Sequence, residues 1–152
     1  MEITEKDIKI ISKKFGISET KILNFLAEEE KKEKISQIKN SYLNKKGEKN
    51  KSAKEWLNLC LNYEDFEDYF FTVNEKFLDM NFFLKWLHAT SSYKERRDIY
   101  NCIENKAIKK EFIKKWVDIS DSLEDVREVM SYIKKSDDEY KLAVRKYLKY
   151  YT

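Results

Sequence analysis

The most apolar stretch of the chain, from Thr72 to His88, predicts a buried central helix. Thr72 and Glu75 are spaced as a capping box, in which each side chain satisfies a backbone N–H group of the first turn. The apolar positions that follow are Phe77, Leu78, Met80, Phe82, Phe83, Leu84, Trp86 and Leu87. A helix that is apolar nearly all round must be covered on most sides, so we expect the rest of the chain to pack around it.

Two shorter helical patterns stand at the N-terminus. Thr4 can cap a first helix, which should end before Gly16 because glycine suits the left-handed position beyond a helix end. Ser18 can then cap a second helix. The apolar residues of the two patterns are Ile8, Ile10, Ile11 and Phe15, followed by Ile22, Leu23, Phe25 and Leu26. We expect the second set to lie on the inner side of a helical hairpin.

Residues 7–26 resemble the helix-turn-helix DNA-binding motif. The features shared with it are a small residue inside the first helix, a glycine at the turn and branched apolar residues in the second helix. The residues concerned are Ser12, Gly16, Ile17, Ser18, Ile22 and Phe25. The resemblance implies that the second helix enters the major groove and brings Glu19, Thr20, Lys21 and Asn24 near base edges. Asn24 would then pair with adenine, and Lys21 with guanine or phosphate.

The charge of this segment favours the alternative interpretation, a plain helical hairpin. Residues 1–30 contain seven acidic residues against five lysines, a net charge of −2. Neutralisation of phosphates supplies most of the non-specific affinity for DNA, so this module would bind a duplex poorly by itself. Such hairpins also occur in proteins that never touch DNA.

The second helix continues into a polar segment, AEEEKKEK, that is typical of a solvent-exposed spacer. Apolar residues return at Ile35, Ile38, Tyr42 and Leu43, and a lysine-rich linker with Gly47 follows. The pattern therefore predicts three parts: a hairpin with a long connecting helix over 1–44, a linker over 45–51 and a helical body over 52–152.

Helix caps recur throughout this body. Capping boxes are predicted at Ser52/Glu55, Ser92/Glu95 and Ser136/Glu139, with a looser one at Ser122/Asp125. Together with Thr72/Glu75 they predict helices near 53–61, 73–88, 93–104, 123–135 and 137–150, with two more near 63–71 and 106–117. Segments 92–103 and 122–133 align without gaps, which resembles an α-helical repeat of about 30 residues. A compact bundle is the alternative arrangement.

The composition supports an all-α fold. The 152 residues include no proline and only two glycines, and 39% are charged. Strands need turns, and the residues that form turns are missing. We therefore expect an all-α chain, in which an N-terminal helical hairpin on a long helix precedes a multi-helix bundle or a short α-solenoid of helix pairs.

Positive charge is concentrated in two blocks. Residues 31–54 contain nine lysines against two acids, and residues 91–117 contain eight basic residues against four acids. Between them, residues 55–90 hold seven acids against two lysines. Solvated lysine-rich faces are the ordinary explanation; contact with phosphates or an acidic partner is the alternative. The candidate contacts in these blocks are Lys45, Lys46, Lys49, Lys51, Arg96, Arg97, Lys106, Lys110 and Lys114.

Catalysis, metal binding and membrane insertion find no support. Cys60 and Cys102 stand alone, and His88, the single histidine, ends an apolar helix, where it suits the helix dipole. Two glycines cannot make a phosphate loop or a nucleophile elbow. No apolar run reaches the ~20 residues of a membrane span, and the start lacks the pattern of a signal peptide. We expect a cytoplasmic protein without catalytic residues, cofactor, metal or small-molecule substrate.

Three functional hypotheses follow, of which the last is an enzyme whose chemistry comes from residues without a spacing signal. The first is a non-catalytic, nucleic-acid-associated regulatory protein that binds DNA or RNA through the hairpin and the basic blocks. The second is an adaptor or inhibitor of a larger protein target, of the anti-defence type that phages and plasmids encode, acting through charge-complementary surfaces. The salt dependence of binding distinguishes the first two, because phosphate binding weakens steeply with salt.

Overall fold

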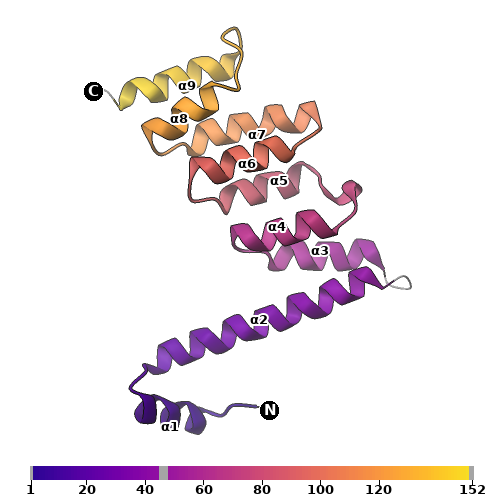
Figure 1. Ribbon diagram of the computed structural model, residues 1–152, viewed down its shortest axis with the longest axis vertical. Helices are drawn as coiled ribbons and strands as arrows, with labels where there is room; N and C mark the ends of the chain where they lie inside the picture. Colours follow the sequence, from indigo (N-terminus) through magenta and orange to yellow (C-terminus); the bar gives the residue numbers. More distant parts are fainter. Residues whose placement is uncertain (1, 45–47, 151–152) are drawn as a thin grey trace. The chain divides into compact units, whose positions relative to one another are not determined.

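The computed structural model describes residues 2–44 and 48–150 and confirms the all-α prediction. These residues form nine α-helices and one short 3-10 helix, with no strand (Figure 1). They group into two compact units, Met1–Leu59 and Cys60–Thr152, here called the N-terminal and C-terminal units.

The N-terminal unit begins with the predicted hairpin. Helix α1 (Glu5–Phe15) is capped by Thr4, whose side chain accepts from the Asp7 N–H while the Asp7 carboxylate accepts from the Thr4 N–H. Gly16 then takes a left-handed conformation at φ 66°, as predicted. Helix α2 (Glu19–Leu43) follows with Ser18 as its cap. The local signals for both helices are confirmed.

The hairpin core is thinner than expected. Ile8 of α1 and Ile22 of α2 are buried where the two helices pack, but Leu23 and Phe25 are 52% and 59% exposed. The prediction that Leu23 and Phe25 lie on the inner side is therefore wrong. The short helix α1 covers only one flank of α2, and residues that point to its other flanks stay in solvent.

Helix α3 (Lys49–Leu59) packs against α2 within the same unit. The Tyr42 and Trp56 rings meet edge to face, with centroids 6.2 Å apart. Ser52 is buried inside α3, so the predicted box of Ser52 and Glu55 does not start this helix. Residues 45–47 of the predicted linker lie outside the described residues, and its last residues belong to α3.

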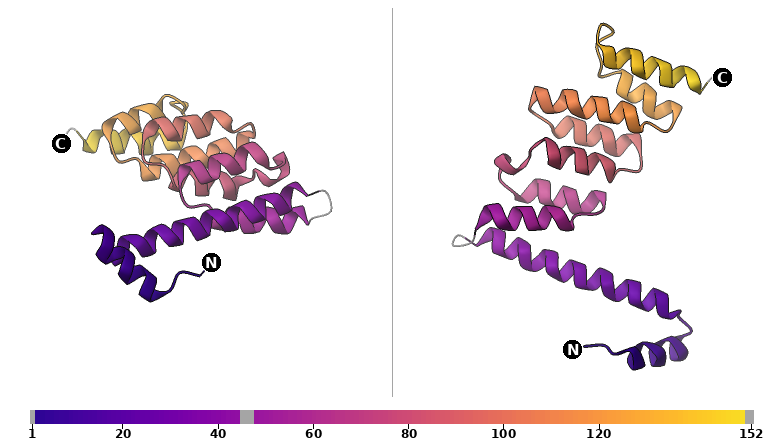
Figure 2. Two further views of the ribbon diagram at one scale, coloured as in Figure 1. Left: turned by 60° about the horizontal axis from the view of Figure 1, so that its bottom comes forward. Right: turned by 180° about the vertical axis from the view of Figure 1, so that it is seen from behind.

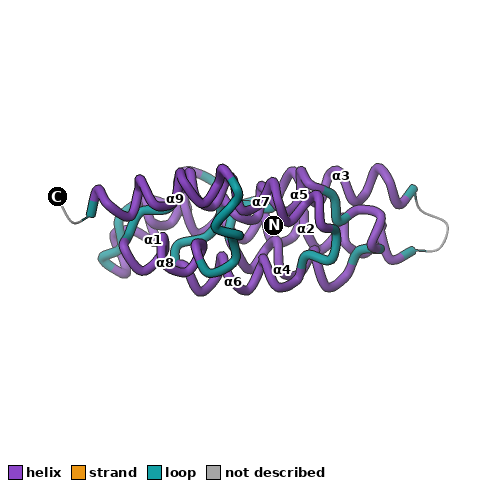
Figure 3. The backbone as a smooth tube through the Cα atoms, turned by 90° about the horizontal axis from the view of Figure 1, so that it is seen from above, coloured by secondary structure: helices purple, strands orange, loops and turns teal. Residues whose placement is uncertain are grey.

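The C-terminal unit consists of three helix pairs arranged in two layers (Figures 1–3). The pairs are α4 (Tyr63–Thr72) with α5 (Met80–His88), α6 (Tyr93–Cys102) with α7 (Lys106–Ile119), and α8 (Leu123–Met130) with α9 (Asp138–Lys149). Contacts run from α5 to α7 to α9 in one layer, and α6 contacts α8 in the other. The stacked pairs have the connectivity of a short α-solenoid.

The predicted central helix is interrupted. Thr72 ends α4, where its hydroxyl donates to the Asp68 carbonyl, and a 3-10 turn (Glu75–Phe77) follows. Helix α5 starts only at Met80, because the Asp79 side chain accepts from the Phe82 N–H. The Thr72/Glu75 capping box is therefore wrong, as is Ser136/Glu139, since Asp137 is the N-cap residue of α9. The predicted core is confirmed for Phe82, Phe83, Trp86 and Leu87, which are buried, whereas the other four predicted positions are only half-buried.

A repeat of 30 residues runs through the whole C-terminal unit. In each pair, the cap side chain accepts from the N–H three residues later: Asn62 from Asp65, Ser92 from Glu95 and Ser122 from Asp125. The acid at that position accepts from the N–H before the cap, which belongs to Leu61, Ser91 and Asp121. The second and third copies could be recognised in the sequence. The first copy could not, because asparagine replaces serine there.

Candidate nucleic-acid interface

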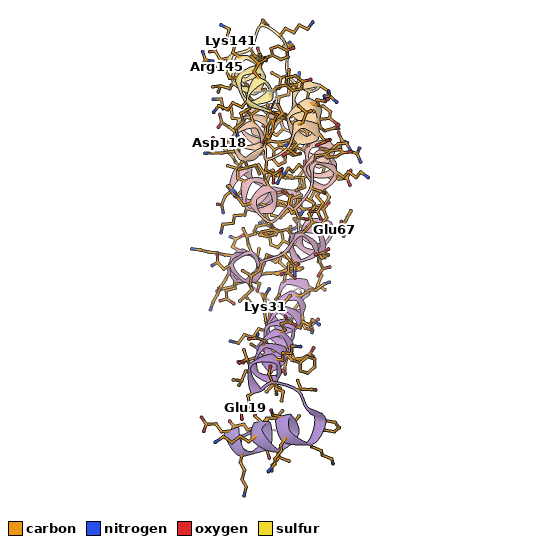
Figure 4. All side chains as sticks on the ribbon, turned by 90° about the vertical axis from the view of Figure 1, so that its left-hand side faces the viewer. Glu19, Lys31, Glu67, Asp118, Lys141 and Arg145 are labelled. Atoms are coloured by element: carbon orange, nitrogen blue, oxygen red, sulfur yellow. The ribbon has the colours of Figure 1, made fainter. Side chains whose placement is uncertain are left out.

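The two helix layers of the C-terminal unit carry opposite charge. Helices α5, α7 and α9 hold ten basic against four acidic side chains, a net charge of +6. Helices α4, α6 and α8 hold four basic against nine acidic side chains, a net charge of −5. We call them the basic layer and the acidic layer. Figure 4 shows Lys141 and Arg145, together with Asp118, on one side of this unit and Glu67 on the other.

The repeat places these charges in register. One position on the outer face of the basic layer is occupied by Lys85, Lys115 and Arg145, thirty residues apart and all exposed. The matching position on the acidic layer is occupied by Asp68, Asp98 and Glu128. Because the register is the same in all three pairs, the like charges at these two positions follow one another along their layers. Other positions of the acidic layer vary in sign, and its middle helix α6 holds three basic against two acidic side chains.

Helices α7 and α9 contribute the densest positive charge. Lys106, Lys110 and Lys114 follow one another at four-residue spacing on α7 and are exposed, as predicted. Lys141, Arg145 and Lys149 repeat this spacing on α9 and are exposed too. The second row was missed, although its period could have been found in the segment predicted as a helix over 137–150.

The start of α7 increases the positive potential. Its Asn105 cap accepts from the Ile108 N–H, and its first turn contains no acidic residue. Most helices place acids there, because carboxylates interact favourably with the partial positive charge of the N-terminus. In α7, Lys106 and Lys109 stand in this turn instead. Each such lysine raises the local potential, which favours an approaching anion.

Two hollows with lysines in their lining border α7. The first, of about 300 Å³, is lined by lysines 106, 109, 110 and 134, by Tyr100, Tyr132, Ile113 and Ile133, and by Asp137 and Glu139. The second, of about 230 Å³, is lined by Lys114, Val117, Asp118, Leu142, Arg145, Lys146 and Lys149. Lys114 lies 3.8 Å from the Glu139 carboxylate, an ion pair that joins a residue of each hollow. Neither hollow was predicted from the sequence.

Arg96 has to be removed from the predicted contacts. Its side chain is buried and its guanidinium pairs with the Asp125 carboxylate, which also accepts from Trp116 Nε1 at 2.6 Å. Arg96 Nε donates to the Thr90 hydroxyl at 2.9 Å. A guanidinium held in this way is not available to a phosphate. The pattern misled because the repeat places Arg96 at an inward position, where Phe66 and Val126 stand in the other copies.

The other predicted contacts are divided between the two units. Arg97 is half-buried, with its Nε 3.5 Å from the Asp98 carboxylate. Lys49 lies over the Tyr42 ring at 4.7 Å, and Lys51 is exposed on α3. Lys45 and Lys46 lie outside the described residues.

The residues predicted to read bases lie together at the start of α2. Thr20, Lys21 and Asn24 are all exposed within its first two turns. The Lys21 backbone N–H donates to the Ser18 hydroxyl, and the Lys21 side chain is exposed. This cluster belongs to the N-terminal unit, whereas the basic layer belongs to the C-terminal unit.

Comparisons with family models, curated proteins and solved structures find no match to this chain. Among the described residues, no three His, Cys, Asp or Glu side chains gather as a metal site would require. Within the same residues, no helix is both long enough and apolar enough to cross a bilayer.

Proposed function

We propose that this chain is a non-catalytic, nucleic-acid-associated regulatory protein that binds a phosphate backbone with its basic layer. The observation that carries the proposal is the separation of charge between two layers of one repeat. The whole chain has a net charge of only +3, whereas three helices on one side of the C-terminal unit have +6. A surface dominated by positive charge attracts a polyanion, and the basic layer provides such a surface although the whole chain is nearly neutral.

The arrangement of the lysines suits a backbone more than an isolated phosphate. Lys106, Lys110 and Lys114 extend over two turns of α7, a distance of about 12 Å at 1.5 Å per residue. A row of that length can neutralise several phosphates at once and release their counterions, which is the main source of sequence-independent affinity.

In this proposal, the N-terminal hairpin contributes base preference, and the basic layer contributes the contacts with phosphates. Asn24 has the side chain that pairs bidentately with adenine, and Lys21 suits guanine or phosphate. The acidic balance of residues 1–30 makes the hairpin a weak binder unaided. We therefore expect the basic layer to supply most of the affinity.

The proposal is tested by the salt dependence of binding to a labelled oligonucleotide. Replacing Lys110, Lys114 and Arg145 by glutamine should flatten the slope of log K against log salt, by up to ~0.9 for each phosphate that is no longer neutralised. Replacing Lys32 and Lys34 of α2 and Lys94 of α6 by glutamine is the matched control, because these exposed lysines belong to none of the proposed contacts. It changes net charge equally but should leave the slope unchanged. A wild-type protein that binds no nucleic acid at low salt would refute the proposal.

A second candidate, the adaptor or inhibitor of a larger protein, is favoured by the exposed apolar side chains of the hairpin. Ile10, Phe15, Leu23 and Phe25 are between 52% and 64% exposed. Clustered exposed apolar residues are typical of protein-interaction surfaces. Replacing Phe15 and Phe25 by serine should abolish capture of a protein partner from the host and spare oligonucleotide binding. Loss of oligonucleotide binding in that variant would count against this division of roles.

A further inference from the structure

We infer that the first hollow, between α6, α7 and the segment after α8, accommodates an unpaired nucleobase, so that the chain prefers single-stranded to duplex nucleic acid. This inference rests on the proposed function and adds the class of nucleic acid to it. The hollow combines an aromatic wall with a basic rim, whereas a site for phosphate alone needs only the rim.

The aromatic wall is held firmly. Tyr100 and Tyr132 come from consecutive repeats, and their ring centroids lie 4.6 Å apart. The centroid of the Tyr132 ring lies 5.8 Å from that of the buried Trp116 ring. The Tyr132 hydroxyl donates to the Glu128 carboxylate at 2.9 Å. The rings therefore form a preorganised surface, half-buried at the two tyrosines, on which a further flat ring can stack.

A cation already occupies one face of this wall. Lys109 Nζ lies over the Tyr100 ring, 4.8 Å from its centroid. The lysine side chain is flexible, so its ammonium group can move to a phosphate when a base takes its place over the ring. After this exchange the base covers the Tyr100 ring face, and the Lys109 ammonium group is paired with a negatively charged phosphate.

The lysines around the hollow can bind the phosphates of the nucleic-acid strand that carries the base. Lys106, Lys110 and Lys134 border the hollow together with Lys109, against the acids Asp137 and Glu139. These lysines can contact the phosphates on either side of a base in a hollow of about 300 Å³. Both features, the stacked rings and the lysine rim, are found in proteins that bind single strands without sequence preference.

A duplex satisfies these features poorly. Its base faces are covered by neighbouring base pairs, and bringing one base out of the stack costs a few kcal/mol. An unpaired strand offers its base faces freely, and each stacked base contributes affinity on an aromatic side chain. The hollow therefore favours a single strand, while the rest of the basic layer attracts either form.

The test compares a labelled oligothymidylate of roughly 15 nucleotides, within the site sizes of known single-strand binders, with a duplex of the same length. The wild type should bind the single strand more tightly. Tyr100→Leu should weaken single-strand binding about tenfold and leave duplex binding unchanged, because only the stacking surface is removed. Tyr100→Phe, which keeps the ring, should bind like the wild type.

A second measurement uses the unmodified protein and does not depend on a variant that folds. On irradiation, an oligonucleotide that carries 5-iodouracil should crosslink to the peptides containing Tyr100 and Tyr132. Equal affinity for both forms, or crosslinks confined to other segments, would overturn the inference and leave backbone binding intact. Failure of the wild type to bind either form would instead refute the proposed function itself.

Discussion

The acidic and basic layers of the C-terminal unit are built by the same repeat, yet their outer faces have opposite charge. Inward positions keep a common role: residues 69, 99 and 129 are Tyr, Ile and Val, and all three are buried. One outward position on each layer keeps a sign of charge instead, as Lys85, Lys115 and Arg145 do on the basic layer. The inner positions therefore determine the fold and leave the outer ones free to form a binding surface.

Phe83→Ala should break the core shared by both layers and produce one of the two largest effects. Phe83 is 3% exposed and contacts the Phe70, Phe82 and Trp86 rings. Removing it should lower the free energy of unfolding by about 3–5 kcal/mol, because a cavity remains. Lys85→Gln, on the outer face of the same helix, should change it by less than ~0.5 kcal/mol. Urea denaturation of both variants measures the difference, and equal stability would place Phe83 outside the core.

Asp125→Ala should lower the free energy of unfolding, because Asp125 is an acid of the acidic layer that is buried in the core. Its carboxylate is the partner of the buried Arg96 and of Trp116 Nε1. Without Asp125 the buried guanidinium keeps only the exposed Asp121 carboxylate, 3.5 Å away, so we expect a loss of up to about 3–5 kcal/mol. Glu124→Gln, one residue earlier and exposed, should cost at most ~1 kcal/mol through the helix dipole. Similar losses in the two variants would contradict the assigned network.

A smaller effect should appear at alkaline pH. Burial raises the pKa of Tyr132 from 10.0 to about 12, and the hydrogen bond to Glu128 adds to the shift. The folded state therefore retains the phenol proton at a pH where the unfolded state has released it. Stability should fall as pH rises from about 10 to about 12, and less steeply in Tyr132→Phe. Urea midpoints across that range give both slopes; parallel slopes would show that Tyr132 titrates normally.

Much of the fold could be predicted from local signals. Thr4, Gly16, Ser18, Ser92 and Ser122 act at the helix ends as expected, because caps depend on groups within one turn. The sequence did not reveal which of two possible N-cap residues begins the apolar helix. Thr72 and Asp79 can both start a helix, and the outcome was an interruption that places Phe77 and Leu78 in half-buried positions before α5.

The candidate site was harder to predict, because it depends on which side chains point outward. A count of charge treats Arg96 and Lys110 alike, although the repeat buries one and exposes the other. The hollow at Tyr100 and Tyr132 joins residues of two repeats, and their proximity follows only from the stacking of α6 against α8. A complete alignment of the three repeats could have separated inward from outward positions.

The central claim, that the basic layer binds nucleic acid, is tested most directly by lysine footprinting. The full chain is acetylated with and without a saturating oligonucleotide, and the modified lysines are quantified by mass spectrometry. We predict protection of Lys106, Lys110, Lys114 and Lys141 on the basic layer, with unchanged reactivity at Lys94 on the acidic layer. Protection confined to Lys21 on the N-terminal hairpin, or equal protection of Lys94 and Lys110, would contradict the claim.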